Sequence, residues 1–375
     1  MRRVFLVVVA ALALLAAEAA AAPPPAPPPV SAPAYVVRGG PEQEIVAARA
    51  PDAKRAPASI TKLMTVLVAL EHARLDDVVT IPPAAASVGE SSVGLRAGEK
   101  LTVGDLAIAA LVPSANDAAT ALALYVGKGS LPRFVELMNA RAKALGLTST
   151  HFENPHGLDQ RGHVSSARDV TTLLTAALRN SFIRTWSTRS TATIAGGRTL
   201  TSTDDLIGTL PLVGAKTGHT NDAGWSQVAA AEENGVRITA SLLGAASESE
   251  RNADLTSLLA WGIDQYRQVV VAGDHVYGHA EVGYGRAPIP LVAARDVIRS
   301  VRLGRPLVER VVASTALSVP VTKGQRVGEV RVFSDGRLIA RTPLVAAASS
   351  PAVGAAGKAE WYARRTAHHV FGLVS

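Results

Sequence analysis

The sequence has no cysteine and few aromatic residues. Without cysteine, the chain can form no disulfide bonds, no thiolate nucleophile and no thiolate zinc site. Aromatic residues make up 4% of the 375 residues, whereas hydrophobic residues of all kinds make up 48%. We therefore expect a core built mainly from Ala, Val and Leu. A chain of this length can bury such a core without disulfides.

Long apolar runs are also scarce, and the clearest one is at the N-terminus. Arg2 and Arg3 precede an apolar stretch at residues 4–17, which Glu18 ends, and small residues follow at 19–22. This arrangement is typical of a secretory signal peptide, so we expect residues 1–22 to be cleaved on export to the periplasm or cell envelope. A retained membrane anchor is the alternative, but the stretch is shorter than the roughly 20 residues that a spanning helix needs.

Acidic residues are fewer than basic ones, and the formal net charge is +7. A positive charge favours anionic partners. The basic residues are scattered and are not interleaved with aromatic residues, so they do not indicate a nucleic-acid surface. Wall polymer and anionic lipid fit an exported chain better.

Changes in composition divide the remaining chain into four parts. Residues 23–34 are rich in proline and predict an extended leader. Residues 35–265 mix helical and strand patterns, which predicts an α+β domain, and residues 266–345 alternate Val-rich runs with Gly turns, which predicts a small all-β domain. In the tail at 346–375, the final stretch would be amphipathic as a helix. It is either a peripheral inner-membrane anchor or a frayed terminus.

Apolar spacing places several elements within the α+β part. Asn234 and Gly235 between two apolar runs predict a hairpin. Arg251 would open the last helix, where we expect an ordinary helix-start arginine, and the alternative is a cation that approaches a carboxylate-binding pocket. The predicted helices cover residues 59–74, 101–111, 131–145 and 251–266.

The first candidate for chemistry is the pair Ser59 and Lys62 at the start of the clearest helix. Residues three apart share one face of a helix, so the hydroxyl and the amine can meet. Serine becomes a good nucleophile when a base takes its proton, and lysine can be that base when burial or a second cation lowers its pKa. The alternative is a helix-capping serine beside an exposed lysine.

Two further short patterns follow along the chain. Ser114 and Asn116 come after an apolar run and could relay a proton and hold a substrate backbone, although a helix cap explains them equally well. Lys216 and Thr217 precede Gly218 and could present a cation and a hydroxyl to a carboxylate, although a solvated turn lysine is the alternative. At Gly218 we expect room for an extended substrate to lie against the strand.

The three patterns occur in the order S-x-x-K, S-x-N and K-T-G, which is the set found in penicillin-binding proteins and class A β-lactamases. On these motifs the sequence resembles the low-molecular-mass penicillin-binding proteins that are D-Ala-D-Ala carboxypeptidases. The resemblance is close over about residues 57–262 and looser beyond. The wider matching strings are PASITKLMT from Pro57, SANDAA from Ser114, NPHGL from Asn154 and KTGHT from Lys216.

The resemblance implies a β-lactamase/transpeptidase-like domain, with helices flanking an antiparallel sheet, followed by a small β-sandwich. It also implies that peptidoglycan pentapeptide stems are the substrate and that β-lactam antibiotics are inhibitors, with no cofactor and no metal. The implied roles are nucleophile for Ser59, general base for Lys62, proton relay for Ser114 and peptide binding for Asn116. Lys216 and Thr217 would bind the substrate carboxylate, and the backbone N–H groups of Ser59 and His219 would form the oxyanion hole.

Other functions remain to be weighed. A DD-endopeptidase would use the same machinery, and nothing in the sequence separates the two. A class A β-lactamase needs a Glu in an E-x-x-x-N loop, and neither Glu136 nor Glu153 has that spacing. A wall-binding protein without activity is disfavoured by the intact motifs. A zinc peptidase is disfavoured because Gly273 and Gly278 make a helix carrying His275 and His279 improbable.

Overall fold

A computed structural model describes residues 25–40, 43–273 and 275–371. The described chain forms two compact units, Pro25–Tyr266 and the residues from Arg267 onward. The predicted signal peptide lies outside the described residues. The proline-rich leader is described in part, and its Val30 and Ala32 are buried in the core of the first unit.

The first unit is built on a five-stranded antiparallel sheet with the strand order β2-β1-β9-β8-β7. Asn234 and Gly235 both have positive φ and form the turn between β8 and β9, as the sequence predicts. The middle strands are buried on both faces because helices cover the sheet on both sides. The strands are β1 (Ala34–Gly39), β2 (Glu44–Arg49), β7 (Leu212–Thr220), β8 (Gly224–Glu233) and β9 (Val236–Ala245).

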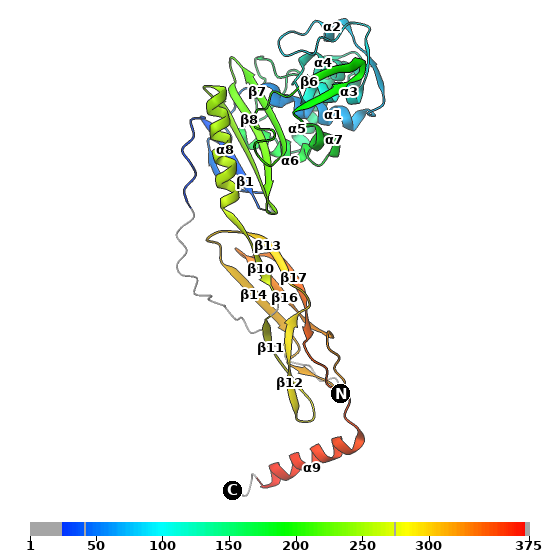
Figure 1. The fold of residues 1–375 in the computed structure, drawn as a ribbon, viewed down its shortest axis with the longest axis vertical. Coiled ribbons are helices and arrows are strands. Elements are labelled where there is room, and N and C mark those ends of the chain that lie inside the picture. The colour runs from blue at the N-terminus through cyan, green and yellow to red at the C-terminus, as the bar shows by residue number, and fades with distance from the viewer. Residues whose placement is uncertain (1–24, 41–42, 274, 372–375) are drawn as a thin grey trace. The chain divides into compact units, whose positions relative to one another are not determined.

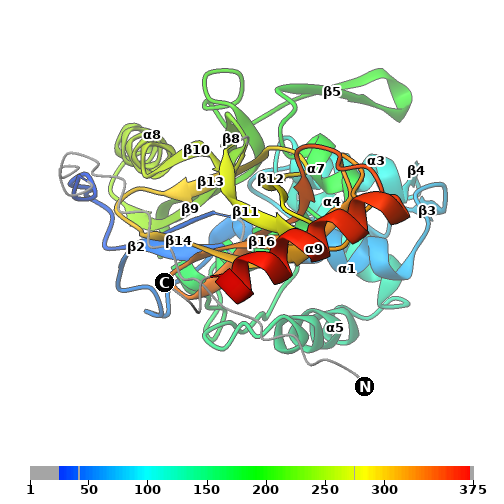
Figure 2. The same ribbon diagram turned by 90° about the horizontal axis from the view of Figure 1, so that it is seen from below.

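Helix α8 (Glu248–Asp264) covers one face of this sheet, and the other helices gather on the opposite side (Figure 1; Figure 2). One hydrophobic cluster fills the space between the sheet and α8, and a larger one fills the helical side. The helical side contains α1 (Thr61–His72), α2 (Pro83–Ala86), α3 (Val103–Leu111), α4 (Asn116–Val126), α5 (Leu131–Ala144), α6 (Ala167–Ala177) and α7 (Ser181–Trp186), with the hairpins β3 (Val78–Thr80)–β4 (Lys100–Thr102) and β5 (Thr191–Ile194)–β6 (Arg198–Thr201).

The second unit is an all-β domain followed by one helix. Its six-stranded sheet has the order β14-β16-β17-β12-β11-β15, and β10 pairs with β13. Val330, Val332 and Leu344 are among the residues that form its core. The elements are β10 (Tyr266–Ala272), β11 (Val276–Val282), β12 (Arg286–Ala293), β13 (Val297–Arg302), β14 (Leu307–Ala313), β15 (Ala316–Leu317), β16 (Arg326–Ser334), β17 (Arg337–Ala346) and α9 (Ala355–Phe371).

This architecture confirms the predicted fold class, an α+β domain followed by an all-β domain. Several element boundaries differ from the sequence prediction, among them both ends of α1, which covers Thr61–His72. The helix expected from residue 101 starts at Val103, because Thr102 and Asp105 form a capping box there and residues 100–102 pair as β4. The last helix of the first unit is α8, which begins at Glu248 and ends at Asp264 before Tyr266 enters β10.

Candidate active site

Ser59 lies in a short 3₁₀ turn, Ala58–Ile60, and not in the first turn of α1 as the helical spacing predicts. Ala58 has a φ of 48°, a left-handed conformation that is strained for a residue with a side chain. The turn brings Ser59 above Lys62 in the first turn of α1. The Lys62 Nζ lies 2.7 Å from the Ser59 Oγ and 2.8 Å from the carbonyl oxygen of His156.

Lys62 is fully buried, as expected for a lysine on an apolar helix face. Burial removes water from the ammonium group and holds the pKa of Lys62 well below its usual range, and the nearby charge of Lys216 lowers it further. Glu90 and Asp117 act in the opposite direction. A neutral amine can donate to the His156 oxygen while its lone pair accepts the proton of the Ser59 hydroxyl.

Two glycines allow the chain to pack closely around the turn that carries Ser59. At Gly157 a Cβ would lie 1.9 Å from the Ala58 carbonyl oxygen, and φ at Gly157 is 92°. At Gly218 a Cβ would lie 3.0 Å from the Ala58 Cβ and 3.1 Å from the Ser59 nitrogen. Gly218 also lines the pocket beside Ser59. Its missing side chain makes room for the turn that carries Ser59, and the expectation that it leaves room for a substrate stays a prediction.

Ser114 and Lys216 form a second hydroxyl–amine pair. Ser114 is almost fully buried, has a φ of 66° and precedes α4, and its Oγ accepts a hydrogen bond of 2.8 Å from the Lys216 Nζ. Lys216 lies on β7, and burial lowers its pKa to about 7, while Asp204 raises it and Arg251 lowers it. At neutral pH this lysine can therefore both carry and release a proton.

Asn116 is buried at the first position of α4. Its amide nitrogen donates to the Gly89 carbonyl oxygen at 3.1 Å, whereas its Oδ1 is buried with no hydrogen-bond partner among the described residues. An unpaired buried amide oxygen is costly, so it is a candidate acceptor for a substrate N–H group.

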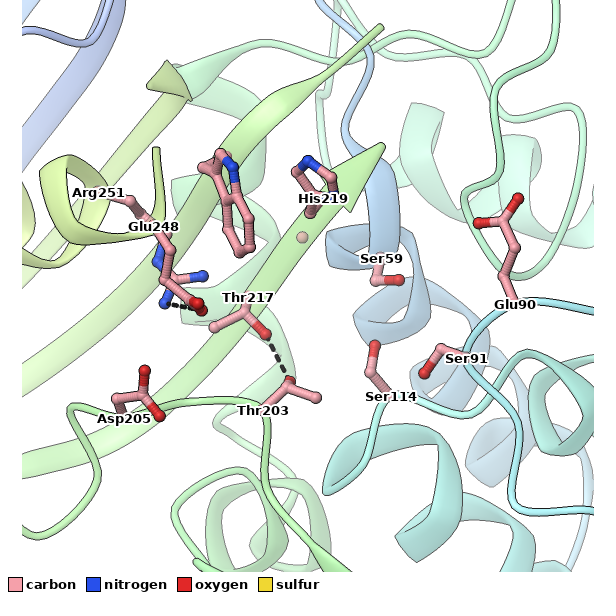
Figure 3. Close-up of a pocket in the computed structure, with 12 residues that line it drawn as sticks. Ser59, Glu90, Ser91, Ser114, Thr203, Asp205, Thr217, His219, Glu248 and Arg251 are labelled. Carbon is pink, nitrogen blue, oxygen red and sulfur yellow. Dashed lines mark hydrogen bonds and ion pairs between the residues drawn. The ribbon is translucent and has the colours of Figure 1, made fainter. Parts of the chain in front are cut away.

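Ser59 and Ser114 both line a pocket of about 470 Å³ beside β7 (Figure 3). Thr217 projects from β7 into this pocket, and its hydroxyl lies 2.8 Å from that of Thr203. Lys216 is adjacent but buried beneath the pocket surface. The strand β7 is at the edge of the sheet, so its free side can pair with an extended peptide.

Arg251 lines the same pocket and is almost fully buried in α8. Its guanidinium group bonds to Glu248 at 3.0 Å and stacks on Trp225, 5.5 Å from the ring centroid. The prediction of an ordinary helix-start arginine is wrong. This cation faces the pocket together with the Thr217 hydroxyl, which makes a binding place for a carboxylate.

His219 follows Gly218 on β7, opposite Ser59 in the pocket (Figure 3). Its ring stacks on Trp225 with centroids 4.2 Å apart. The preceding residue, Gly218, packs against the turn that carries Ser59. The structure thus brings all seven residues singled out from the sequence to one region, around Ser59, Ser114 and β7.

Sequence reasoning missed three contributors. Glu90 lines the pocket and affects the pKa of Lys62, and the His156 carbonyl fixes the Lys62 amine. Thr203 supports Thr217. Asn154 and Gly157 around His156 were part of a string that matched the family, but the string gave no sign that a backbone oxygen would contact Lys62.

Two other observations bear on the alternatives. Glu136 lies on α5 and Glu153 contacts His151 at 3.2 Å, and neither lines the pocket of Ser59. His279 lies on strand β11 and not on a helix. Within the described ranges, no group of three or more His, Asp or Glu side chains is arranged to hold a metal ion.

The comparisons with known proteins agree with this geometry. Residues 19–247 match the family model described as D-alanyl-D-alanine carboxypeptidase, and residues 265–351 match that of the C-terminal domain of penicillin-binding protein 5. D-alanyl-D-alanine carboxypeptidase DacD of Salmonella typhimurium is 33% identical over 84% of this chain and 85% of its own length. DacA of Escherichia coli is 32% identical over 92% of this chain and 89% of its own length.

A solved structure of a penicillin-binding protein has the same fold. Penicillin-binding protein 5 of Haemophilus influenzae superimposes with a TM-score of 0.64 at 28% identity, covering 88% of this chain and all of that one. Its resemblance extends over both units, as the coverage shows. On the match of the family model and of these relatives, the chain belongs to the D-alanyl-D-alanine carboxypeptidase family.

Proposed function

We propose that this D-alanyl-D-alanine carboxypeptidase works through an acyl-enzyme on Ser59, and that β-lactams acylate the same hydroxyl. The observation that carries the proposal is the buried contact of 2.7 Å between the Lys62 amine and the Ser59 hydroxyl, in a pocket beside an edge strand. The substrate is the peptidoglycan stem peptide that ends in D-Ala-D-Ala.

In the first step the Lys62 lone pair takes the proton of the Ser59 hydroxyl. The Ser59 Oγ forms a bond to the carbonyl carbon of the penultimate D-alanine, and the carbonyl electrons move to its oxygen. The N–H groups of Ser59 and His219 stabilise this oxyanion. The base must be neutral to act, and burial together with Lys216 favours that state.

The terminal D-alanine then leaves as its C–N bond breaks and the electrons return to form the ester carbonyl. The leaving nitrogen takes the hydroxyl proton of Ser114, which recovers it from the Lys216 ammonium group 2.8 Å away. The proton held by Lys62 then passes to Lys216, so that Lys216 is charged and Lys62 is neutral again. Water attacks the ester carbonyl while Lys62 takes its proton, the bond between the carbonyl carbon and the Ser59 Oγ breaks, and Lys62 gives the proton to the Ser59 oxygen.

The substrate carboxylate is bound by the Thr217 hydroxyl and the Arg251 guanidinium, which both line the pocket. Lys216 contributes positive charge from beneath and is engaged with Ser114 and the Thr217 carbonyl. The Asn116 oxygen accepts an N–H of the peptide. The role of Lys216 therefore changes from binding the carboxylate to supplying a proton through Ser114. The other sequence-based roles are kept, and Arg251 is added to the carboxylate site.

The proposed location of the enzyme rests on its N-terminal segment and on helix α9. Residues 1–22 direct export to the periplasm and are removed, and α9 contacts the inner membrane from outside. In support, α9 carries Trp361 and Tyr362 together with Lys358, Arg364 and Arg365, and such residues suit a membrane interface with anionic lipid. Among the described residues, no helix is long and apolar enough to cross a bilayer.

Mapping of a labelled penicillin adduct tests the acyl-enzyme. We expect a single adduct on Ser59 in the wild-type protein, none in Ser59→Ala, and release of D-alanine from a pentapeptide by the wild type alone. An adduct on another residue would contradict the proposal. Rapid release of hydrolysed penicillin would favour the β-lactamase instead, and cleavage of cross-linked dimers in preference to pentapeptides would favour the endopeptidase.

A further inference from the structure

A second pocket lies next to the site of Ser59, at the end of β7. It has a volume of about 440 Å³, and its charged lining consists of Lys54, Arg55, Asp159 and Asp222. Its walls are residues 53–56, which lead into the turn of Ser59, four residues of the loop at 159–164, and Asp222, which follows β7. The proposed mechanism uses none of these side chains.

The direction of β7 tells which part of a substrate reaches this second pocket. Thr217, near the carboxylate site, comes before His219, which is beside Ser59, and Asp222 comes three residues after His219. A peptide on the strand edge with its C-terminal carboxylate at Thr217 places the scissile carbonyl at Ser59. The residues that precede the scissile bond then continue toward Asp222, at about 3.3 Å per residue.

The pocket is held in place by hydrogen bonds. The carboxylate of Asp159 accepts a bond of 2.5 Å from the Thr220 hydroxyl and one of 3.1 Å from the Asp222 backbone N–H. Arg55 exchanges two backbone hydrogen bonds of 2.8 Å with Ser165, which follows the lining residue Val164. The fixed turn presents the Asp222 side chain at the rim.

The pocket lining carries two basic and two acidic side chains, and one of each sign can bind a ligand. Among the described residues, no hydrogen bond or ion pair involves the side chain of Lys54 or of Asp222, and both are exposed. His163 forms part of the floor, where it bonds to the Thr61 hydroxyl and accepts from the Glu153 N–H. Burial lowers its pKa to about 4, so it adds no charge near neutral pH.

A ligand for this pocket should therefore carry one positive and one negative group. We propose that the second pocket binds the side chain of the stem residue immediately before D-Ala-D-Ala, and that it prefers a side chain ending in both an ammonium and a carboxylate group. Asp222 pairs with the ammonium and Lys54 with the carboxylate. This inference rests on the proposed function, because it uses the substrate direction along β7.

Three synthetic pentapeptides that differ only at the third residue test the proposal. The third residue is diaminopimelic acid, lysine or Nε-acetyllysine, and kcat/KM is measured for release of D-alanine. We expect the wild type to prefer diaminopimelic acid over lysine and lysine over acetyllysine. Asp222→Asn should lower the ratio of lysine to acetyllysine by about tenfold, the size of one charge-assisted hydrogen bond, and Lys54→Gln should remove the preference for diaminopimelic acid over lysine.

The matched control is Asp76→Asn, which removes the same charge from an exposed aspartate that lines neither pocket. Its ratios should equal those of the wild type. Labelled penicillin titrates the folded, competent fraction of each variant, so misfolding does not affect the ratios. Equal rates with all three peptides, or unchanged ratios in Asp222→Asn, would overturn the second pocket while leaving the acyl-enzyme intact. If the wild-type protein formed no penicillin adduct and cleaved no peptide, the proposed function itself would be overturned.

Discussion

At the scale of single residues, the site depends on two lysines that are buried beside two hydroxyls. Lys62 needs to be neutral to accept a proton from Ser59, whereas Lys216 needs to be charged to supply one through Ser114. Burial alone would neutralise both amines. The charge of Asp204 near Lys216 opposes this, and the pKa of Lys216 is about 7, so this amine can still carry a proton at neutral pH.

The different states of the two lysines make a prediction for the pH dependence of acylation. The rate of penicillin acylation should fall at high pH as Lys216, with a pKa of about 7, loses its proton. The charge of Arg251 lowers the pKa of Lys216, so Arg251→Gln should raise that pKa. The alkaline limb of the pH–rate profile, where acylation slows at high pH, should then move to higher pH. Arg251→Lys keeps the charge and should leave the limb in place. A limb that stays fixed or moves to lower pH in Arg251→Gln would show that Lys216 is not the acid.

At the scale of elements, close backbone contacts fix the turn that carries Ser59. The sequence predicts a helix that starts at residue 59, and the chain instead forms a 3₁₀ turn with a left-handed Ala58 before α1. Periodicity could not show this, because the deviation is imposed by β7 and the loop at Gly157, which are distant in sequence. Similarly, Arg251 could be placed on a helix from its neighbours, but its burial against Trp225 depends on the sheet.

The motifs, in contrast, could be found from the sequence alone. Ser59, Lys62, Ser114 and Lys216 occur in short patterns whose order along the chain carries the information. The contribution of Glu90 could not be found in this way, because it reaches the pocket through a loop that Asp117 holds by hydrogen bonds to Ser92 and Leu95. Such a loop has no signature in composition or spacing.

Substitution of Gly157 tests the contact with the turn. In Gly157→Ala the new methyl group would collide with the Ala58 carbonyl, so we expect a lower Tm and a loss of acylation rate on the order of 10²-fold, as small displacements of a nucleophile cause. The control is Gly146→Ala, where φ is 72° and nothing lies within 4 Å of the Cβ. That variant should lose roughly 1–2 kcal/mol of stability from the left-handed backbone alone and acylate normally. Equal acylation by the two variants would contradict the role of the contact.

At the scale of the whole molecule, every residue of the proposed active site lies within Pro25–Tyr266. This unit has its own cores on both faces of the sheet. Among the residues that the structure describes, those that line the two pockets all belong to the first unit. Its all-β composition was readable from the alternating Val and Gly pattern, whereas the pairing order of its strands was not, because it depends on long-range contacts.

A chain that ends at Tyr266 should therefore acylate with penicillin at the wild-type rate. The measurement is the second-order rate constant for labelled penicillin, with circular dichroism to confirm that the shortened protein is folded. Slow acylation by a folded, shortened chain would mean that the second unit supports the site. The shortened chain should also fail to sediment with vesicles of anionic lipid, which a full chain carrying α9 should bind.

The central claim is that the buried amine of Lys62 takes the proton of Ser59. The most direct measurement is the rate constant for acylation by penicillin in Lys62→Ala, compared with the wild type and with Lys143→Ala as a control for loss of an exposed lysine on α5 that lines neither pocket. We expect Lys62→Ala to be slower by about 10²–10⁴-fold, the usual contribution of a general base, with a Tm that shows a folded protein. Acylation of folded Lys62→Ala at the wild-type rate would contradict the account.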